Sequence, residues 1–283
     1  EYSMMAYSTI VDLFLVFEEH NHFEADDLEE YWNSARGKLK NSTSLLHQGI
    51  DFLLKSKICE ISPYLLIDNS PEKIPKMNGS NQASYSDFFT HDSSKLPKIY
   101  NAYCSPPLTD RFRELYEKSR TRRNKIVHTI DNNLTLEAKT IIQESIELIR
   151  YFLNDKWVDL RRDFLENSSE FQLHFESEII NQTLLWEFSA LHTILPDQRF
   201  KQIYGVSKKT RFFRCPNCTR SDYVYDPPNT ALLTPNTAQS DEVTCLICDE
   251  QFDVIRVSCA GAQCKSNVIL ADSDECLICG EGN

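Results

Sequence analysis

Three polar residues near the middle of the chain, Arg123, Asn124 and His128, have side chains that could act together on a phosphate. Arg presents a fixed fork of donors that matches phosphate oxygens, and His can transfer a proton near neutral pH. Asn can orient either of them. A His that exchanges a proton at the scissile phosphate and an Arg that stabilises charge on phosphorus suffice for metal-free RNA cleavage. The nucleophile would be the ribose 2′-OH, which restricts the substrate to RNA.

These residues fall in the second half of an expected helix that begins after Thr109, a suitable N-cap, and ends near Asp131. Its apolar side recurs at the helical period as Phe112, Leu115, Tyr116, Ser119, Ile126, Val127 and Ile130. Arg123 falls within this stripe and needs a partner there, because a lone buried charge is costly. Asn124 and His128 lie one turn apart, whereas Arg123 is about 140° from His128 at roughly 100° per residue. A second copy of the helix could close that gap.

The segment Arg123-Asn124-Lys-Ile-Val-His128 resembles the R-x4-H signature of the HEPN superfamily, which prefers a polar residue directly after the Arg. An upstream segment, Gly49–Lys57, is similar to the acidic-apolar-Lys second helix of HEPN domains. The resemblance covers residues 1–156 and implies a bundle of four or five helices. It also implies a metal-independent endoribonuclease that works as a homodimer, with the active site at or near the interface and 2′,3′-cyclic phosphate products.

The same resemblance implies a toxin or antiviral-defence effector that cuts host or invader RNA and has an antitoxin or defence-system partner protein. Some HEPN toxins carry a Tyr two residues beyond the His, which a nucleotidyltransferase antitoxin modifies. This chain has Ile130 at that position, which argues against such control. Asp51 stands where HEPN-like second helices carry an acid, so it is a candidate catalytic partner for Arg123 or His128. A solvent-facing Asp fits the sequence equally well.

Eight of the ten cysteines lie late in the chain at spacings typical of metal ligands. They are Cys215 and Cys218, Cys245 and Cys248, Cys259 and Cys264, and Cys276 and Cys279. With short strand-like segments between them, such as Tyr223–Tyr225 and Phe252–Val257, they predict two four-Cys zinc ribbons. Sequential pairing, the first four on one ion and the last four on the other, is the simplest assignment, and exchange between the sets stays open. Sites made of four thiolates leave no position for water, so the two zinc ions are expected to be structural; iron fits less well.

Basic residues accompany both motifs. Arg120, Arg122 and Lys125 surround Arg123, and they either line bound RNA or are merely solvated. Before the first Cys pair, the basic residues Lys208, Lys209, Arg211 and Arg214 alternate with Phe212 and Phe213. Such a pattern could hold phosphates and stack bases. The alternative is a solvated linker with both Phe side chains facing the core.

The pattern of elements predicts a mainly α protein in three parts: a HEPN-like bundle over 1–156, a helical connector over 157–207 and a small β-rich tail over 208–283. Gly37 and Gly49 are expected to break or bend the second helix. The Pro-rich stretch 62–107 would be a long connection with short helices near Tyr85–Phe89 and Leu96–Tyr103. It would either lie over the site or form a surface insertion.

Composition limits the function classes. The net charge of −12 argues against a broad basic face for nucleic acid, so RNA contact would be local. This charge mildly favours a second hypothesis, a non-catalytic dimeric adaptor that binds nucleic acid or protein through its ribbons. The cysteine pattern suits a reducing cytoplasm rather than a disulfide scaffold. The longest apolar run, Met4–Phe17, is too short for a membrane span and has no basic segment before it, so we expect a cytoplasmic protein without a membrane partner.

Overall fold

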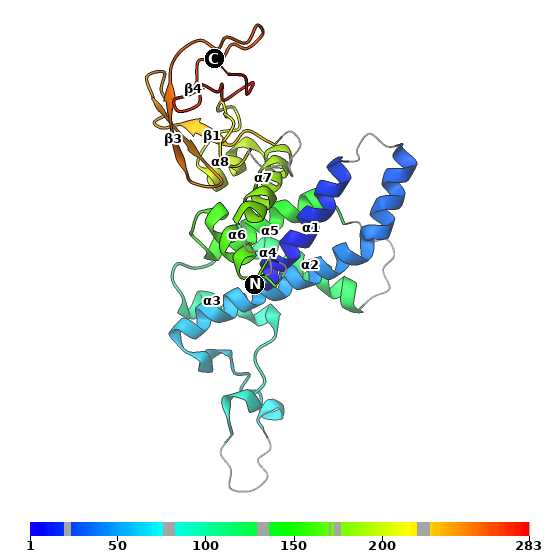
Figure 1. Ribbon diagram of the computed structural model, residues 1–283. Helices are drawn as coiled ribbons and strands as arrows, with labels where there is room; N and C mark the ends of the chain where they lie inside the picture. The colour runs from blue at the N-terminus through cyan, green and yellow to red at the C-terminus, as the bar shows by residue number, and fades with distance from the viewer. Residues whose placement is uncertain are drawn as a thin grey trace. The chain divides into compact units, whose positions relative to one another are not determined.

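The chain divides into two compact units, Glu1–Asn154 and Asp155–Asn283 (Figure 1). The computed structural model describes residues 1–19, 24–75, 83–128, 136–169, 171–172, 177–219 and 227–282. Most of the described elements are helices, and a small antiparallel sheet with two groups of cysteines lies near the C-terminus. The predicted mainly α class with a β-containing tail is therefore confirmed. None of the described helices is long and apolar enough to cross a membrane.

The first unit is built around one long helix. Its main elements are α1 (Tyr2–Glu19), α2 (Ala25–Ile61), α4 (Asp110–His128) and α5 (Ala138–Phe152). Helix α2 packs against each of the other three, and α1 also packs on α5; Figure 1 shows α1 lying beside the blue part of α2. The centre of this bundle is almost closed to water, with Tyr7, Ile10, Leu46, Ile50, Leu54 and Ile142 all buried. Burial of such side chains contributes about 1.5–3 kcal/mol each.

Helix α2 continues through both Gly37 and Gly49, so neither glycine breaks the second helix. Gly49 instead permits close approach of α1. A Cβ at Gly49 would lie 2.1 Å from Ser3 Oγ and 2.6 Å from the Ser3 backbone nitrogen. A Cβ at Gly37 would meet nothing within 4 Å. The two glycines therefore have different effects on stability although both are helical.

We expect Gly49→Ala to destabilise the protein by about 1–3 kcal/mol, because the added methyl group would push the start of α1 away from α2. We expect Gly37→Ala to stabilise it by up to about 1 kcal/mol, since Ala is the better helix former and the space is open. Chemical denaturation of the two variants measures both effects. A Gly49→Ala protein at least as stable as wild type would contradict the close approach of α1.

Helix α4 carries the R-x4-H motif, and its first turns match the sequence pattern. Thr109 Oγ1 accepts a hydrogen bond of 3.2 Å from the Phe112 backbone nitrogen, which confirms the predicted cap. Four of the predicted apolar-stripe residues are buried, namely Phe112, Leu115, Tyr116 and Ser119. The end of the helix differs: Val127 is 51% exposed, because the last turns border a cleft rather than the core. Ile130 and the predicted helix end at Asp131 lie outside the described residues.

The Pro-rich connection between α2 and α4 is ordered by short helices. They are η1 (Pro63–Leu66), η2 (Pro71–Lys73), η3 (Tyr85–Asp87), η4 (Ser93–Lys95) and α3 (Leu96–Tyr103), so both predicted short helices are present. The buried carboxylate of Asp68 joins parts of this segment by accepting hydrogen bonds from Lys73 Nζ at 2.8 Å and Lys95 Nζ at 3.4 Å. Tyr116 Oη on α4 lies 2.9 Å from Ser93 O. The connection thus reaches the motif helix instead of extending only over the surface.

The second unit combines helices with the sheet. Its elements are α6 (Trp157–Glu166), α7 (Ser177–Ile194), α8 (Asp197–Tyr204), β1 (Ala231–Leu233), β2 (Glu242–Cys245), β3 (Gln251–Ile255) and β4 (Ile269–Leu270). The strands are antiparallel in the order β1-β2-β3-β4, with Val243 opposite Phe252 and Val254 opposite Leu270. Strand β3 matches the predicted Phe252–Val257 segment and pairs on both sides. The predicted strand at Tyr223–Tyr225 lies outside the described residues.

Direct contacts join these helices to the tail. Arg162 Nη2 donates a 2.7 Å hydrogen bond to the carbonyl oxygen of Ile247, which lies between Cys245 and Cys248. The rings of Phe188 on α7 and Phe212 have centroids 5.5 Å apart. Residues 157–207, expected to be a connector, therefore pack with the tail in one compact unit.

Candidate active-site cleft and metal centres

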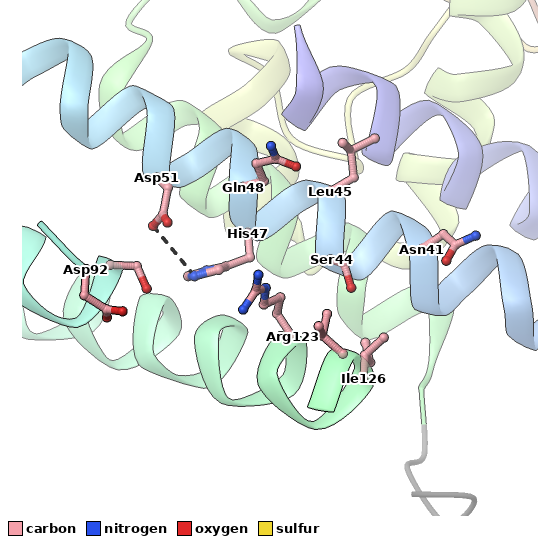
Figure 2. Close-up of a pocket in the computed structure, with 11 residues that line it drawn as sticks. Asn41, Ser44, Leu45, His47, Gln48, Asp51, Asp92, Arg123 and Ile126 are labelled. Carbon is pink, nitrogen blue, oxygen red and sulfur yellow. Dashed lines mark ion pairs between the residues drawn. The ribbon is translucent and has the colours of Figure 1, made fainter. Parts of the chain in front are cut away.

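A cleft of about 700 Å³ lies in the first unit between α2, the residues at the start of η4, and the last turns of α4 (Figure 2). Its titratable lining residues are His47 and Asp51 from α2, Asp92 from the Pro-rich connection, and Arg123 from α4. Uncharged polar groups, among them Ser44, complete much of the wall. Segments far apart in the sequence thus converge on one open, polar space.

Arg123 is the residue of the R-x4-H motif that lies in this cleft. Figure 2 shows its guanidinium reaching from α4 toward His47 on α2. Arg123 Nη1 donates a 3.0 Å hydrogen bond to Asn124 Oδ1, so Asn124 steadies the guanidinium as the residue types suggested. This fork of donors at the cleft wall is suited to a phosphate.

His128 is placed differently. It is the exposed last residue of α4, whereas the cleft near the helix end is lined by Ile126 and Val127. Within one copy of the chain, the structure therefore brings Arg123 and Asp51 to one cleft, with Asn124 contacting Arg123. It does not bring His128 into that cleft.

Asp51 lies in a polar network that the sequence pattern did not reveal. Its Oδ1 accepts a short hydrogen bond from Tyr116 Oη and lies 3.7 Å from His47 Nε2. His47 is 2% exposed, and its ring centroid lies 5.2 Å from that of Tyr116. Sequence reasoning gave His47 no role. The available signal was its separation of four residues from Asp51, which puts both on one face of a helix.

The electrostatics of the cleft keep His47 uncharged. Burial, and to a smaller extent the positive charges of Arg123 and Arg120, lower the pKa of His47 to about 4. Burial raises the pKa of Asp51, while the hydrogen bond from Tyr116 and the charges of nearby cations oppose that rise. At neutral pH the cleft therefore presents a neutral imidazole beside a guanidinium.

This arrangement predicts a pH-dependent stability. The pKa of His47 is lowered from 6.5 to about 4 in the folded state. The contribution of His47 to the free energy of unfolding is therefore fully present above pH 6.5 and is lost as the pH falls through 4. At about 1.4 kcal/mol per pKa unit, the loss is roughly 3 kcal/mol. Chemical denaturation of wild type and His47→Gln over this pH range measures it. The raised pKa of Asp51 affects the stability of both proteins, and in the opposite direction to His47. If the stabilities of wild type and His47→Gln fell in parallel as the pH was lowered, the prediction would be wrong.

The basic residues around Arg123 are mostly engaged in ion pairs. Arg120 Nη2 lies 2.8 Å from Glu117 Oε2, and Arg122 Nη1 lies 2.8 Å from Glu144 Oε2 on α5. Glu144 is 7% exposed, so the Arg122 pair joins α4 to α5 in a largely closed environment. Lys125 is exposed. Of the three expected RNA-binding residues on this helix, Arg122 thus has a clear structural role.

The basic stretch before the first Cys pair is also involved in packing. Lys208 Nζ donates to the Leu195 carbonyl oxygen at 2.8 Å, and Arg214 Nη1 lies 3.8 Å from Glu275 Oε1. The Arg211 guanidinium lies 5.5 Å from the ring centroid of Phe213, which is 2% exposed. Lys209 is exposed. The contacts of Lys208, Arg211 and Arg214 are those of a segment that holds the second unit together.

Eight cysteines form two groups in the order of the sequence. One contains Cys215, Cys218, Cys245 and Cys248, and the other contains Cys259, Cys264, Cys276 and Cys279; within each group the sulfur atoms lie within 4.8 Å of one another. The sequential pairing is therefore the one in the structure. Sulfur–sulfur distances of 3.6 Å between Cys215 and Cys248, and 3.7 Å between Cys264 and Cys276, are close to the roughly 3.8 Å edge of a tetrahedron with 2.3 Å bonds to zinc.

The backbone around the sulfurs fits bound thiolates. Amide groups of Cys218, Ile247 and Gly261 point at sulfur atoms from 3.3–3.4 Å. The residue after the second Cys of two pairs has positive φ, 59° at Asp249 and 76° at Gly280, which closes each turn. Each group of four thiolates could hold one metal ion and has the donor set of a closed, structural site.

Comparisons with models of protein families, with curated proteins and with solved structures find no match for this chain. The functional assignment therefore depends on the chemistry of the cleft and of the cysteine groups.

Proposed function

We propose that this protein is a metal-independent endoribonuclease of the HEPN type, which cleaves RNA by attack of the ribose 2′-OH. The observation that carries the proposal is the position of Arg123, steadied by Asn124 and facing an open polar cleft. A guanidinium with donors available to a ligand can bind a phosphodiester and stabilise the charge that develops on phosphorus. Arg123 and Asn124, which are adjacent in the motif, would thus act together on the bound phosphate.

The proposal requires a second copy of the chain. His128 lies outside the cleft of its own copy, so it would transfer a proton at a site formed with the partner's α4 helix. The end of α4 supports this arrangement, because Val127, 51% exposed beside His128, gives it an apolar surface that a second copy would cover. The active site would then lie at the homodimer interface.

The metal ions in this proposal are two zinc ions, one in each four-Cys group. Zinc would hold the second unit in its folded form and leave the RNA chemistry to the bundle.

We further propose that the protein serves as a toxin or antiviral-defence effector, and that the second unit recruits the RNA, a trigger or a partner protein. Eight thiolates around closed sites and the small sheet they brace support a binding module of this kind.

The test is an RNA cleavage assay with purified, metal-loaded protein and no added Mg²⁺ or Ca²⁺. Wild type should release fragments ending in 2′,3′-cyclic phosphate. His128→Ala should lower the rate by about 10²–10⁴-fold, the usual contribution of a general acid or base. If wild type and His128→Ala cleaved RNA at the same rate, the proposed nuclease function would be excluded.

That outcome would favour the second function, a non-catalytic dimeric adaptor. The net charge of −12 and the pairing of Arg122 with Glu144 favour it, since both reduce the basic surface available to RNA. An adaptor would dimerise through the bundle and bind its partner through the second unit. Nucleic acid or protein that copurifies with His128→Ala would identify the ligand class.

A further inference from the structure

His47 is a buried polar side chain without a hydrogen-bond partner. It is 2% exposed, and within the described part of the chain neither Nδ1 nor Nε2 has a partner. A buried polar group left in this state destabilises the fold until it gains a partner. Because His47 also lines the open cleft, a ligand entering there could supply the missing partner.

The groups that face His47 come from every element packed around it. Asp51 of α2 lies 3.7 Å from His47 Nε2, and Tyr116 of α4 donates to that same carboxylate. Arg123 and Arg120 of α4 supply positive charge, and Asp92 also lines the cleft. A carboxylate that is fixed by a tyrosine and lies beside an imidazole can orient the ring and stabilise its protonated form.

We propose that His47 is a catalytic general base, which takes the proton from the ribose 2′-OH of RNA bound in the cleft while Asp51 orients it. This inference rests on the proposed nuclease function. The 2′ oxygen then forms a bond to phosphorus, and the bond from phosphorus to O5′ breaks. A protonated His128 from the second copy gives its proton to O5′. The products are a 2′,3′-cyclic phosphate and a 5′-OH, with His47 protonated and His128 neutral until both re-equilibrate with water.

The charge state of His47 suits this role. With its pKa lowered to about 4, the imidazole is neutral at pH 7 and can accept a proton. Burial disfavours protonation of His47 most, and the positive charge of Arg123 adds to it; a phosphodiester bound to Arg123 would offset this second cause. Substrate binding would thereby strengthen the base at the moment when it is needed.

The experiment compares His47→Gln, His128→Ala and wild type on two RNA substrates in single-turnover assays. One substrate is ordinary RNA, and the other carries sulfur in place of O5′ at the cleavage site. A thiolate leaves without protonation, so loss of a general acid does not slow its cleavage, whereas loss of a general base does. His47→Gln should be slower by about 10²–10⁴-fold on both substrates, and His128→Ala should recover on the sulfur substrate.

A second variant keeps the test decisive if His47→Gln folds poorly. Asp51→Asn should lower kcat by at least about tenfold with KM little changed, and shift the pH profile of kcat, because Asp51 acts through His47. Binding to RNA with a 2′-deoxy sugar at the cleavage site should stay within a few-fold of wild type for both variants.

The outcomes separate the two proposals. A wild type that cleaves neither RNA overturns the nuclease function and the role of His47 together. His47→Gln at the wild-type rate, with His128→Ala slow on ordinary RNA, overturns the role of His47 alone. Recovery of His47→Gln on the sulfur substrate also overturns it, since that result belongs to a general acid.

Discussion

Replacing Cys245 with serine should reduce the bound metal from two ions per chain to one or none and should unfold the sheet. Cys245 is fully buried at the end of β2, and its sulfur lies 3.9 Å from that of Cys218. Structural zinc sites contribute about 10–16 kcal/mol of apparent folding free energy in small domains at neutral pH. A sheet of short strands buries too little apolar surface to offset the loss of that folding free energy. Elemental analysis of metal per chain and limited proteolysis of the second unit measure the two effects.

The matched comparison is serine at Cys279, an exposed thiol of the second group. Strand β3 pairs with β2 near the first group and with β4 near the second, so both groups brace one strand. Loss of the second group should release one ion and β4 while β1, β2 and β3 stay paired. Loss of the first group removes the support of β2 and should therefore affect metal binding by both groups.

Serine at Cys59 is the control, because this thiol lies on α2 of the first unit and outside both groups. It should leave two ions bound. If the Cys245 variant also retained two ions and resisted protease like wild type, the four-sulfur arrangement of the first group would not be a metal site.

The metal groups were the most predictable part of the molecule because their information is local. Three of the four Cys pairs span a turn of four residues, and the positive φ at Asp249 and Gly280 follows two of these turns. The spacing could not decide between sequential and exchanged pairing. The decision comes from strand pairing, since β1 and β2 bring Cys245 close to Cys215 and Cys218.

The cleft was only half predictable. The motif identified Arg123, and the acid position identified Asp51, but His47 and Asp92 were not expected to join them. Periodicity gives the angle of a side chain around its own helix, but it does not give the element that lies opposite. Asp92 and Ser93 reach the cleft through a Pro-rich segment whose path is fixed by tertiary contacts such as the one between Tyr116 Oη and Ser93 O.

The same limit applies to two residues on helix faces, Val127 and Gly49. Val127 continues the apolar period of α4, yet no described neighbour covers most of it, and it stays 51% exposed. Gly49 looked like a helix breaker because Gly has a low helix propensity. Its place against Ser3 depends on α1, which lies far away in the sequence. Tertiary packing outweighed local preference in both cases.

Replacing Arg123 with lysine should lower the RNA cleavage rate by about 10²–10³-fold, although the positive charge is retained. Lysine is a point charge and cannot offer two parallel donors to a phosphate. It also lacks the donor geometry by which Arg123 Nη1 binds Asn124 Oδ1 at 3.0 Å. Removal of one preorganised donor from a developing oxyanion typically has an effect of this size. Single-turnover rates at saturating protein isolate the chemical step.

The control is Arg122→Lys on the preceding position of the same helix. Arg122 pairs with Glu144, and a lysine there keeps the charge and can keep the ion pair, so cleavage should stay within a few-fold of wild type. A similar rate for both lysine variants would mean that only positive charge matters near the end of α4. In that case the fork of donors at the cleft wall would have no part in transition-state stabilisation, because a charge acting through space is nearly insensitive to the exchange of Arg for Lys.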